Sequence, residues 1–268
     1  MAQPPEVPTD GAPPGVVTVQ LEGRTALVTI DRPDARNAVS KEVAEGLEAA
    51  LDRIEADDEI LTAVLTGSGS VFCAGADLGA FIEGRDTELF TRRGGFAGFV
   101  RYPRTKPVIA AVNGPAMAGG FELALACDLL VAVRTARFGL PEVKLSLIAG
   151  GGGLVHLPRL LAKQTALKIL LTGDPIDAEE AHRLGLVTQL AEPGEAVTAA
   201  LALAAAINAN GPVAVRETLR LANASLDLDP EATWRASGQA LYDIARTDDG
   251  REGPHSFLEK RPPNWTGH

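Results

Sequence analysis

The stretch of residues 106–130 constrains the fold of this chain more than any other segment. An apolar run at 108–112 predicts a short buried strand. The Asn-Gly-Pro sequence at 113–115 predicts a turn, small residues fill 116–120, and a helical pattern starts at Phe121. A strand, a glycine-rich turn and a helix in this order gather free backbone N–H groups at the positive end of the helix. Because glycine lets a ligand approach the backbone closely, we expect a binding site here.

Two acids follow in or after this stretch. Glu122 lies in the first turn of the predicted helix among apolar residues, an unfavourable place for a carboxylate without a function. Glu142 follows Pro141 in a predicted loop. Carboxyl groups in a partly apolar cleft have raised pKa values and could divide the roles of general acid and base. Two structural alternatives stay open: Glu122 as an acid that complements the helix dipole, and Glu142 as an ordinary loop residue.

Two loops of small residues, 74–78 and 116–120, each follow a predicted strand and present backbone N–H groups. One N–H from each loop would form an oxyanion hole, which stabilises an oxygen atom on which negative charge develops. The sequence contains no Gly-x-Ser-x-Gly motif and no cysteine beside a histidine. The glycine run at 149–153 is a weak phosphate signal, and no dinucleotide fingerprint follows a first strand, which argues against a nicotinamide-dependent enzyme.

Length and composition limit the size of the fold and the kinds of molecule that the protein can bind. The 268 residues suffice for one large domain, or for a main domain with a small appendage. A formal net charge of −10 argues against nucleic acid or an anionic membrane as the main partner. Cys73 and Cys127 lie in apolar stretches, which favours buried reduced thiols over a disulfide. The four histidines form no zinc pattern, so the sequence predicts no metal site.

The rest of the chain suggests an α/β fold with a helical C-terminal part. Residues 1–15 are proline-rich without the apolar core of a signal peptide, and we interpret them as a disordered leader of a soluble, cytoplasmic protein. Apolar runs at 16–20 and 25–30 predict a β-hairpin, and later strands spaced by helices indicate crossover connections. Three helices are predicted near the C-terminus, at roughly 194–209, 212–223 and 230–246.

Residues 79–105 are less regular and hold half of the eight phenylalanines, namely Phe81, Phe90, Phe96 and Phe99. They are mixed with charged residues and with a Gly-Gly pair at 94–95. Two interpretations stay open. The segment is either a mobile amphipathic helix that covers the core or an apolar cover for a hydrophobic ligand.

Several segments together resemble the enoyl-CoA hydratases of the crotonase superfamily. They are Asp31-Arg32-Pro33 with Asn37-Ala38, then 72–78, 106–114, 118–124, 138–142 and 171–173, and finally Glu252-Gly253 with 257–261. Each motif alone is modest. Together they follow the order and spacing of the family over nearly all of residues 16–261, which makes the resemblance specific.

The resemblance implies a crotonase-like (ClpP/crotonase) α/β fold. It places a β-β-α spiral core at 16–200 and a helical C-terminal trimerisation region at 201–268, so that the chains assemble as a homotrimer or as a homohexamer of two trimers. The ligand it implies is an acyl-CoA thioester, with coenzyme A as part of the substrate and no separate cofactor. The implied activity belongs to fatty acid metabolism and β-oxidation.

The resemblance also assigns roles to residues. By the family pattern, the backbone N–H groups of Ala76 and Gly119 hold the thioester oxygen. Glu122 and Glu142 match the two catalytic glutamates of the family, which grip one water. In this assignment Glu122 orients and deprotonates the water that adds to C3 of a trans-2-enoyl-CoA, and Glu142 donates a proton to C2, with the two acting as a coupled pair.

Other positions match the contacts of coenzyme A. The backbone around Ala35, Ala74, Asp77 and Leu78 matches the family's adenine and pantetheine contacts. Near the C-terminus, Phe257 and Lys260 match a stretch that often reaches the nucleotide. For these last two residues an alternative stays open, in which they belong to a helix that anchors its own subunit.

Two departures and several rival functions accompany the resemblance. Ala118 stands where many hydratases have glycine, and Phe121 stands where a smaller residue is common, which could reshape the acyl pocket. The same oxyanion hole serves isomerases, thioester hydrolases, dehalogenases and a carnitinyl-CoA dehydratase. The presence of both glutamates favours addition or removal of water. A non-catalytic acyl-CoA-binding protein is the rival of another class.

Overall fold

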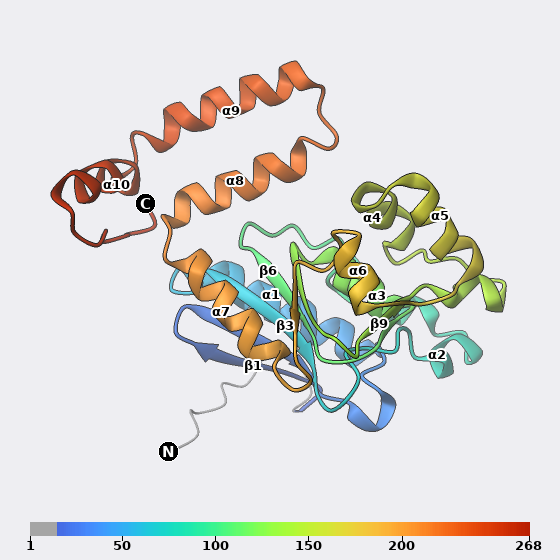
Figure 1. The fold of residues 1–268 in the computed structure, drawn as a ribbon. Coiled ribbons are helices and arrows are strands. Elements are labelled where there is room, and N and C mark those ends of the chain that lie inside the picture. Colours follow the sequence, from blue (N-terminus) through green and yellow to red (C-terminus); the bar gives the residue numbers. More distant parts are fainter. Residues whose placement is uncertain (1–14) are drawn as a thin grey trace.

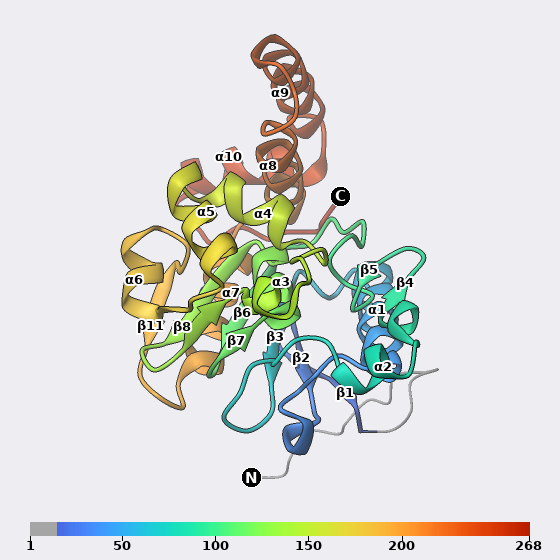
Figure 2. The same ribbon diagram turned by 90° about the vertical axis from the view of Figure 1, so that its right-hand side faces the viewer.

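A computed structural model describes residues 15–268 of the chain. The predicted leader therefore lies, apart from its last residue, outside the described residues. The described part has a central six-stranded sheet, a smaller second sheet, a set of covering helices and a helical arm (Figures 1 and 2).

The central sheet has the strand order β1-β2-β3-β6-β8-β11. Its strands are β1 (Val17–Glu22), β2 (Thr25–Ile30), β3 (Thr62–Gly67), β6 (Val108–Val112), β8 (Leu129–Val133) and β11 (Gln189–Ala191). The first two form the predicted antiparallel hairpin, and every later pair is parallel. All residues of β3 and β6 are buried, as expected for central parallel strands whose two faces are covered.

Two helices pack directly on this sheet. The first, α1 (Lys41–Ala56), contacts β1 and β2, and the second, α7 (Ala196–Asn208), contacts β3, β6 and β8. Ser40 caps α1 by accepting a hydrogen bond of 3.4 Å from the backbone N–H of Val43. The buried face of α1 comprises Val43, Ala44, Gly46, Leu47, Ala50, Leu51 and Ile54.

A second sheet carries the end of the predicted ligand-binding stretch. It has the order β10-β9-β7, with the strands β10 (Ile176–Asp177), β9 (Arg137–Gly139) and β7 (Ala116–Met117). The chain leaves β7 through Ala118 and enters α3 (Gly119–Ala126), which is buried at every residue. The strand predicted before loop 74–78 is reduced to one parallel bridge, between Cys73 and Ala116 of β7.

The segment 79–105 is not one helix. It forms α2 (Leu78–Ile82), the 3₁₀ helix η2 (Asp86–Leu89) and a two-stranded ribbon of β4 (Phe90–Thr91) and β5 (Gly95–Phe96). Gly95 and Gly98 have φ values of +67° and +65°, which breaks helical continuity in the second half of the segment. Three of its phenylalanines, Phe81, Phe90 and Phe96, line a cavity described below. Phe96 also belongs to the core, and Phe99 belongs to the core without lining the cavity.

The remaining elements before the C-terminal part are short helices. They are η1 (Pro33–Ala35), η3 (Pro141–Leu145), α4 (Gly153–Leu160), α5 (Lys163–Thr172) and α6 (Ala178–Arg183). Residues 161–162 adopt extended backbone angles and separate α4 from α5. Asp177 caps α6, accepting a hydrogen bond of 2.8 Å from the backbone N–H of Glu180.

The C-terminal residues form an arm that projects away from the two sheets (Figure 1). The arm comprises α8 (Pro212–Ala224), α9 (Pro230–Ile244) and α10 (Asp248–Glu259). The three predicted C-terminal helices correspond to α7, α8 and α9, whereas α10 was not predicted. Since α7 packs on the sheet, the helices of the arm begin after Asn208. Trp265 fastens the chain end to the body, donating a hydrogen bond of 2.9 Å from Nε1 to the Ala209 carbonyl.

Within residues 15–268, no single helix combines the length and apolar character needed to cross a membrane. One bent pair, α7 with α8, meets the criterion by length and composition only.

Candidate active site

Three parallel bridges place the predicted site residues at one edge of the second sheet. Val39 pairs with Ala76, Cys73 pairs with Ala116, and Met117 pairs with Gly139. Because parallel strands run in the same direction, the segments that follow these pairs leave on the same side. Those segments are the small-residue loop 74–78, the first residues of α3, and η3. The register of short strands therefore brings together residues that lie far apart in the sequence.

The two predicted amide donors lie beside each other. A Cβ atom added to Gly119 would lie 3.4 Å from the Ala76 nitrogen, and one added to Gly75 would lie 3.0 Å from the Gly119 nitrogen. Among residues 15–268, neither the Ala76 nor the Gly119 N–H donates a backbone hydrogen bond. Gly119 is the first residue of α3, so its N–H lies at the positive end of the helix. Both amides are free to donate to one oxygen atom.

Ala118 adopts an unusual backbone conformation just before this donor. Its φ is +50° and its ψ is −128°, a region that glycine accepts and other residues rarely enter. The residue is held on both sides: its N–H donates to the Gly139 carbonyl at 2.8 Å, and its carbonyl accepts from Phe121 N–H at 2.8 Å. Strain of this kind persists where the surroundings over-determine it, and here it aims the Gly119 amide.

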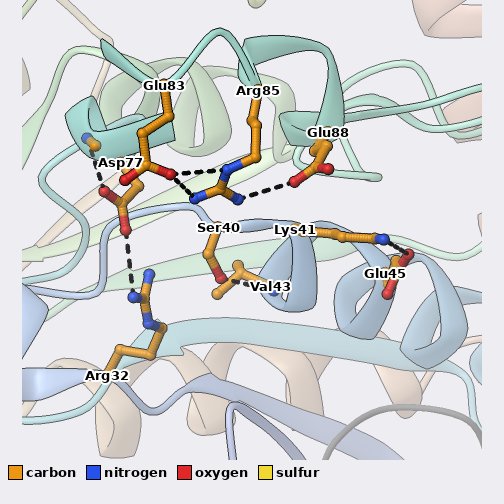
Figure 3. Close-up of polar contacts among 10 residues, drawn as sticks. Arg32, Ser40, Lys41, Val43, Glu45, Asp77, Glu83, Arg85 and Glu88 are labelled. Carbon is orange, nitrogen blue, oxygen red and sulfur yellow. Dashed lines mark hydrogen bonds and ion pairs between the residues drawn. The ribbon is translucent and has the colours of Figure 1, made fainter. Parts of the chain in front are cut away.

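Polar contacts brace the loop that carries Ala76. Asp77 bridges two elements, because one carboxylate oxygen accepts from Gly79 N–H at 3.1 Å and the other pairs with the Arg32 guanidinium at 3.3 Å (Figure 3). The same guanidinium donates to the Ala38 carbonyl at 2.6 Å. Loop 31–39 and loop 74–78 are thus joined by side chains as well as by the Val39–Ala76 bridge. This pairing holds the first amide donor in place.

Glu122 is buried and held by backbone amides. Its side chain is 4% exposed, and its Oε1 accepts a hydrogen bond of 2.9 Å from Gly153 N–H at the start of α4. Burial and the nearby charge of Glu142 raise the pKa of Glu122 to about 7, although the amides of residues 151–153 act in the opposite direction. The carboxylate thus binds the glycine loop before α4 and is not a cap for its own helix.

Glu142 is less buried but has an unpaired oxygen. Among the described residues, its Oε2 atom is inaccessible to solvent and has no hydrogen-bond partner. Burial raises the pKa of this carboxyl above its ordinary value. A buried acid with a free oxygen atom favours the protonated form, which can donate to a ligand. Glu142 is therefore not an ordinary loop acid.

One cavity of about 780 Å³ joins these groups. Its lining includes Ala76, Gly119, Glu122 and Glu142, and also the four predicted coenzyme A positions Ala35, Ala74, Asp77 and Leu78. The rest of the wall is mainly apolar: Phe81, Phe90, Phe96, Leu145, Leu147 and Ile148 all line it. Such a cavity suits a ligand with an apolar chain and one polar reacting group. Within residues 15–268, no cluster of three or more His, Cys, Asp or Glu side chains is arranged for a metal ion.

Two predicted contacts are not brought to this cavity. Phe257 and Lys260 lie at the end of the arm, in and just after α10, and do not line the cavity of their own chain. The Phe257 side chain is 82% exposed. A single chain therefore places them neither against a ligand nor in its own core.

Comparisons with known proteins agree with this arrangement. The family model for enoyl-CoA hydratase/isomerase matches residues 21–268. The chain belongs to the enoyl-CoA hydratase/isomerase family. A crystal structure of an enoyl-CoA hydratase from Mycobacterium tuberculosis H37Rv is 46% identical and superimposes with a TM-score of 0.91, covering 95% of this chain and 100% of that one. The fold is thus the crotonase-like α/β fold that the sequence predicted.

Individual relatives in the family carry related names. Enoyl-CoA hydratase EchA19 from Mycobacterium tuberculosis is 40% identical, with 92% of this chain and 95% of that protein covered. The short-chain-enoyl-CoA hydratase of Clostridium acetobutylicum is 37% identical, with 91% and 95% covered. A carnitinyl-CoA dehydratase from Salmonella arizonae is also 37% identical, with 90% and 94% covered. Water is added or removed in each of these named activities.

Two contacts of this site were not predicted from the sequence. The glycine run that ends at Gly153 was interpreted only as a weak phosphate signal, whereas its amides hold the Glu122 carboxylate. A Cβ atom on Gly151 would lie 2.5 Å from Glu122 Oε2, so the loop requires glycine there for close approach. The sequence placed Phe96 only among four phenylalanines of a possible apolar cover, and the fold reveals its contacts with Gly119 and Gly151. The glycine run was a visible signal, but nothing in the sequence linked it to Glu122.

Proposed function

We propose that this protein is an enoyl-CoA hydratase that reversibly adds water to a trans-2-enoyl-CoA and forms a 3-hydroxyacyl-CoA. The observation that carries this proposal is the pair of glutamates beside two free amides in one apolar cavity. Two donors polarise the thioester carbonyl, and two carboxyl groups of raised pKa handle the protons of water. The family membership and the named hydratase relatives support it.

The two glutamates take different roles in the proposed reaction. Glu122, whose Oε1 accepts a hydrogen bond from Gly153 N–H, orients the water and in its ionised form accepts a proton as the water oxygen attacks C3. Its pKa of about 7 suits a base that works near neutral pH. Glu142 has the unpaired oxygen, so its protonated form delivers a proton to C2. The electrons of the double bond pass to the thioester oxygen, which Ala76 and Gly119 stabilise until C2 is protonated. The two carboxyls titrate as a pair.

Binding energy from coenzyme A positions the acyl group. Ala35, Ala74, Asp77 and Leu78 would contact the adenine and pantetheine parts, remote from the reacting carbons. Such remote contacts lower the barrier by fixing the thioester carbonyl against its donors. We propose no cofactor besides this part of the substrate.

We also propose that the chain assembles as a homotrimer, or as a hexamer of two trimers, through its arm. The arm leaves large apolar side chains exposed, with Trp234 75%, Leu241 74% and Phe257 82% accessible. Patches of this kind are typical of interfaces. Assembly would also let Phe257 and Lys260 reach the nucleotide of a neighbouring subunit. Light scattering after gel filtration gives the expected mass of three or six chains, and a monomer would contradict the proposal.

The cellular setting is a further proposal. A cytoplasmic enzyme of fatty acid β-oxidation would meet trans-2-enoyl-CoA thioesters from an acyl-CoA oxidation step and pass on a 3-hydroxyacyl-CoA. Fractionation of the source cells, with the protein found in the membrane or secreted fraction, would contradict the location.

A product assay with crotonyl-CoA tests the activity. We expect the absorbance of the conjugated enoyl thioester to fall while no free thiol appears. Release of thiol would indicate a thioester hydrolase, and a shifted double bond an isomerase. Binding without turnover, unchanged in Glu122→Gln and Glu142→Gln variants, would indicate a non-catalytic acyl-CoA-binding protein. Carnitinyl-CoA is the second substrate to test, because carnitinyl-CoA dehydratases are among the relatives.

A further inference from the structure

Phe96 lies between the two parts of the catalytic site, namely the amide donors and the Glu122 carboxylate. The residue is only 4% exposed and lines the cavity from β5, where its ring meets that of Phe90 edge-on at 5.4 Å. The ribbon pairing of Phe90 with Phe96 and hydrogen bonds from Phe99 and Val100 N–H to the Phe96 carbonyl hold its backbone. The position of the ring is therefore fixed by its own segment.

The tip of the ring touches the oxyanion donor. A Cβ atom on Gly119 would lie 2.4 Å from Phe96 Cζ and 2.6 Å from Cε1, so these atoms pack directly on the Gly119 backbone. The base of the ring touches the loop that holds Glu122. A Cβ atom on Gly151 would lie 2.9 Å from Phe96 Cγ and 2.5 Å from Glu122 Oε2, so ring and carboxylate lie against the same backbone atom.

We propose that Phe96 is a positioning residue for both halves of the site: its tip fixes the Gly119 amide, and its base keeps water from the Glu122 carboxylate. This role rests on the proposed hydration reaction for its effect on rate, but not for its effect on the carboxylate. It gives the irregular segment 79–105 a part in the chemistry beyond covering the acyl chain.

The charged and titratable groups around Glu122 are few. Glu142 faces it from η3, and the amides of residues 151–153 face it from the loop before α4. On α4, which packs against α3, the titratable and charged groups are His156 and Arg159. The pKa of His156 is lowered by burial and by the charges of Arg104 and Arg159. None of these groups lies on the ribbon of Phe96, so a change at Phe96 alters water access to Glu122 without removing a charge.

Substitution of Phe96 by leucine separates its contact with Gly119 from its contact with Gly151. Phe96→Leu retains a Cγ and two Cδ atoms near Gly151 but lacks the ring tip at Gly119. Phe96→Ala lacks both. Phe99 provides the matched control, because it is a buried phenylalanine of the same segment that belongs to the core and does not line the cavity.

The experiment combines a carboxyl NMR titration of Glu122 with hydration kinetics on crotonyl-CoA. In Phe96→Ala we expect the pKa of Glu122 to fall from about 7 toward 4.5, with the acid limb of the kcat profile moving the same way. In Phe96→Leu we expect that pKa to remain, while kcat falls about tenfold or more and KM changes little. Phe99→Leu and Phe99→Ala should leave the titration unchanged and kcat within a few-fold.

The outcomes separate this inference from the proposed function. If the wild-type protein does not hydrate crotonyl-CoA but the pKa of Glu122 still falls in Phe96→Ala, the hydratase proposal is refuted. The proposed shielding of Glu122 by Phe96 is then still supported. An active enzyme whose Glu122 titration is the same in Phe96→Ala and wild type would overturn the inference. If Phe96→Ala does not fold, the comparison of Phe96→Leu with Phe99→Leu tests the inference. Equal losses of kcat in these two variants would overturn the inference.

Discussion

The two halves of the proposed catalytic site are built on different physical principles. The amide half depends on backbone geometry. Strand register, the strained Ala118 and the start of α3 orient two backbone N–H groups, which cannot rotate independently as a side chain can. The carboxyl half depends on environment, because burial and neighbouring amides set the pKa values of Glu122 and Glu142. The amide half should therefore tolerate little change in shape, and the carboxyl half little change in charge or water access.

The largest effect is expected from neutralising the carboxyl half. Glu122→Gln or Glu142→Gln should lower kcat for crotonyl-CoA hydration by about 10²–10⁴-fold, because each removes a proton donor or acceptor at the reacting carbons. Binding of a saturated acyl-CoA should change little, since the amides and the coenzyme A contacts remain. Glu45→Gln, at an exposed position on α1, is the control. Steady-state kinetics and calorimetry measure both quantities, and full activity in either catalytic variant would refute the division of roles.

A single methyl group should disable the amide half. Gly119→Ala places a Cβ atom against the Phe96 ring and beside the Ala76 nitrogen, so the donors can no longer meet one oxygen. We expect kcat/KM to fall by about 10²–10³-fold, the cost typical of one lost oxyanion donor.

The control for this variant is Gly238→Ala on α9, where an added Cβ atom meets nothing within 4 Å. Activity within a few-fold of wild type is expected for it. If Gly119→Ala behaved like Gly238→Ala, the amide half would be more adaptable than its geometry indicates.

The sequence predicted the amide half better than the carboxyl environment. Small-residue loops and a helix start indicate free N–H groups locally, and the family resemblance selects Ala76 and Gly119 among them. The acids Glu122 and Glu142 could also be chosen, but not the reason for their raised pKa values. That reason lies in the burial of both carboxyl groups and, for Glu122, in the nearby charge of Glu142. Only long-range packing produces this environment, and no local pattern encodes it.

The same dependence on long-range packing explains where the prediction of the fold was wrong. The segment 79–105 has enough apolar residues for a helix, but tight turns at Gly95 and Gly98 fold it into a ribbon. The C-terminal helices were predicted from their period alone, which shows where helices lie but not which of them pack on the sheet. The placement of α7 on the body followed from tertiary contacts.

The stability of the protein should report the burial of Glu122. Because the pKa of this carboxyl is raised from 4.5 to about 7, the folded state binds more protons than the unfolded state between these pH values. Stability therefore falls as the pH rises through this window, by about 3 kcal/mol in all. Urea titrations from pH 4 to pH 8 should show this fall in wild type relative to Glu122→Gln. Parallel curves for the two proteins would contradict the buried environment.

The smallest effect is expected at Ala118. Glycine accepts its φ of +50° without strain, so Ala118→Gly should raise the free energy of unfolding by about 1 kcal/mol. Because the neighbouring hydrogen bonds still aim the Gly119 amide, kcat should stay within a few-fold of wild type. Urea unfolding measures the first quantity. A less stable glycine variant would show that the backbone at this position is not strained.

The central claim is tested most directly by a crystal structure of the Glu142→Gln variant with crotonyl-CoA bound. The account predicts a thioester oxygen within about 3 Å of both the Ala76 and Gly119 nitrogens, with C2 and C3 facing residues 122 and 142. A thioester oxygen bound elsewhere, or an enoyl group turned away from both carboxyl positions, would contradict it.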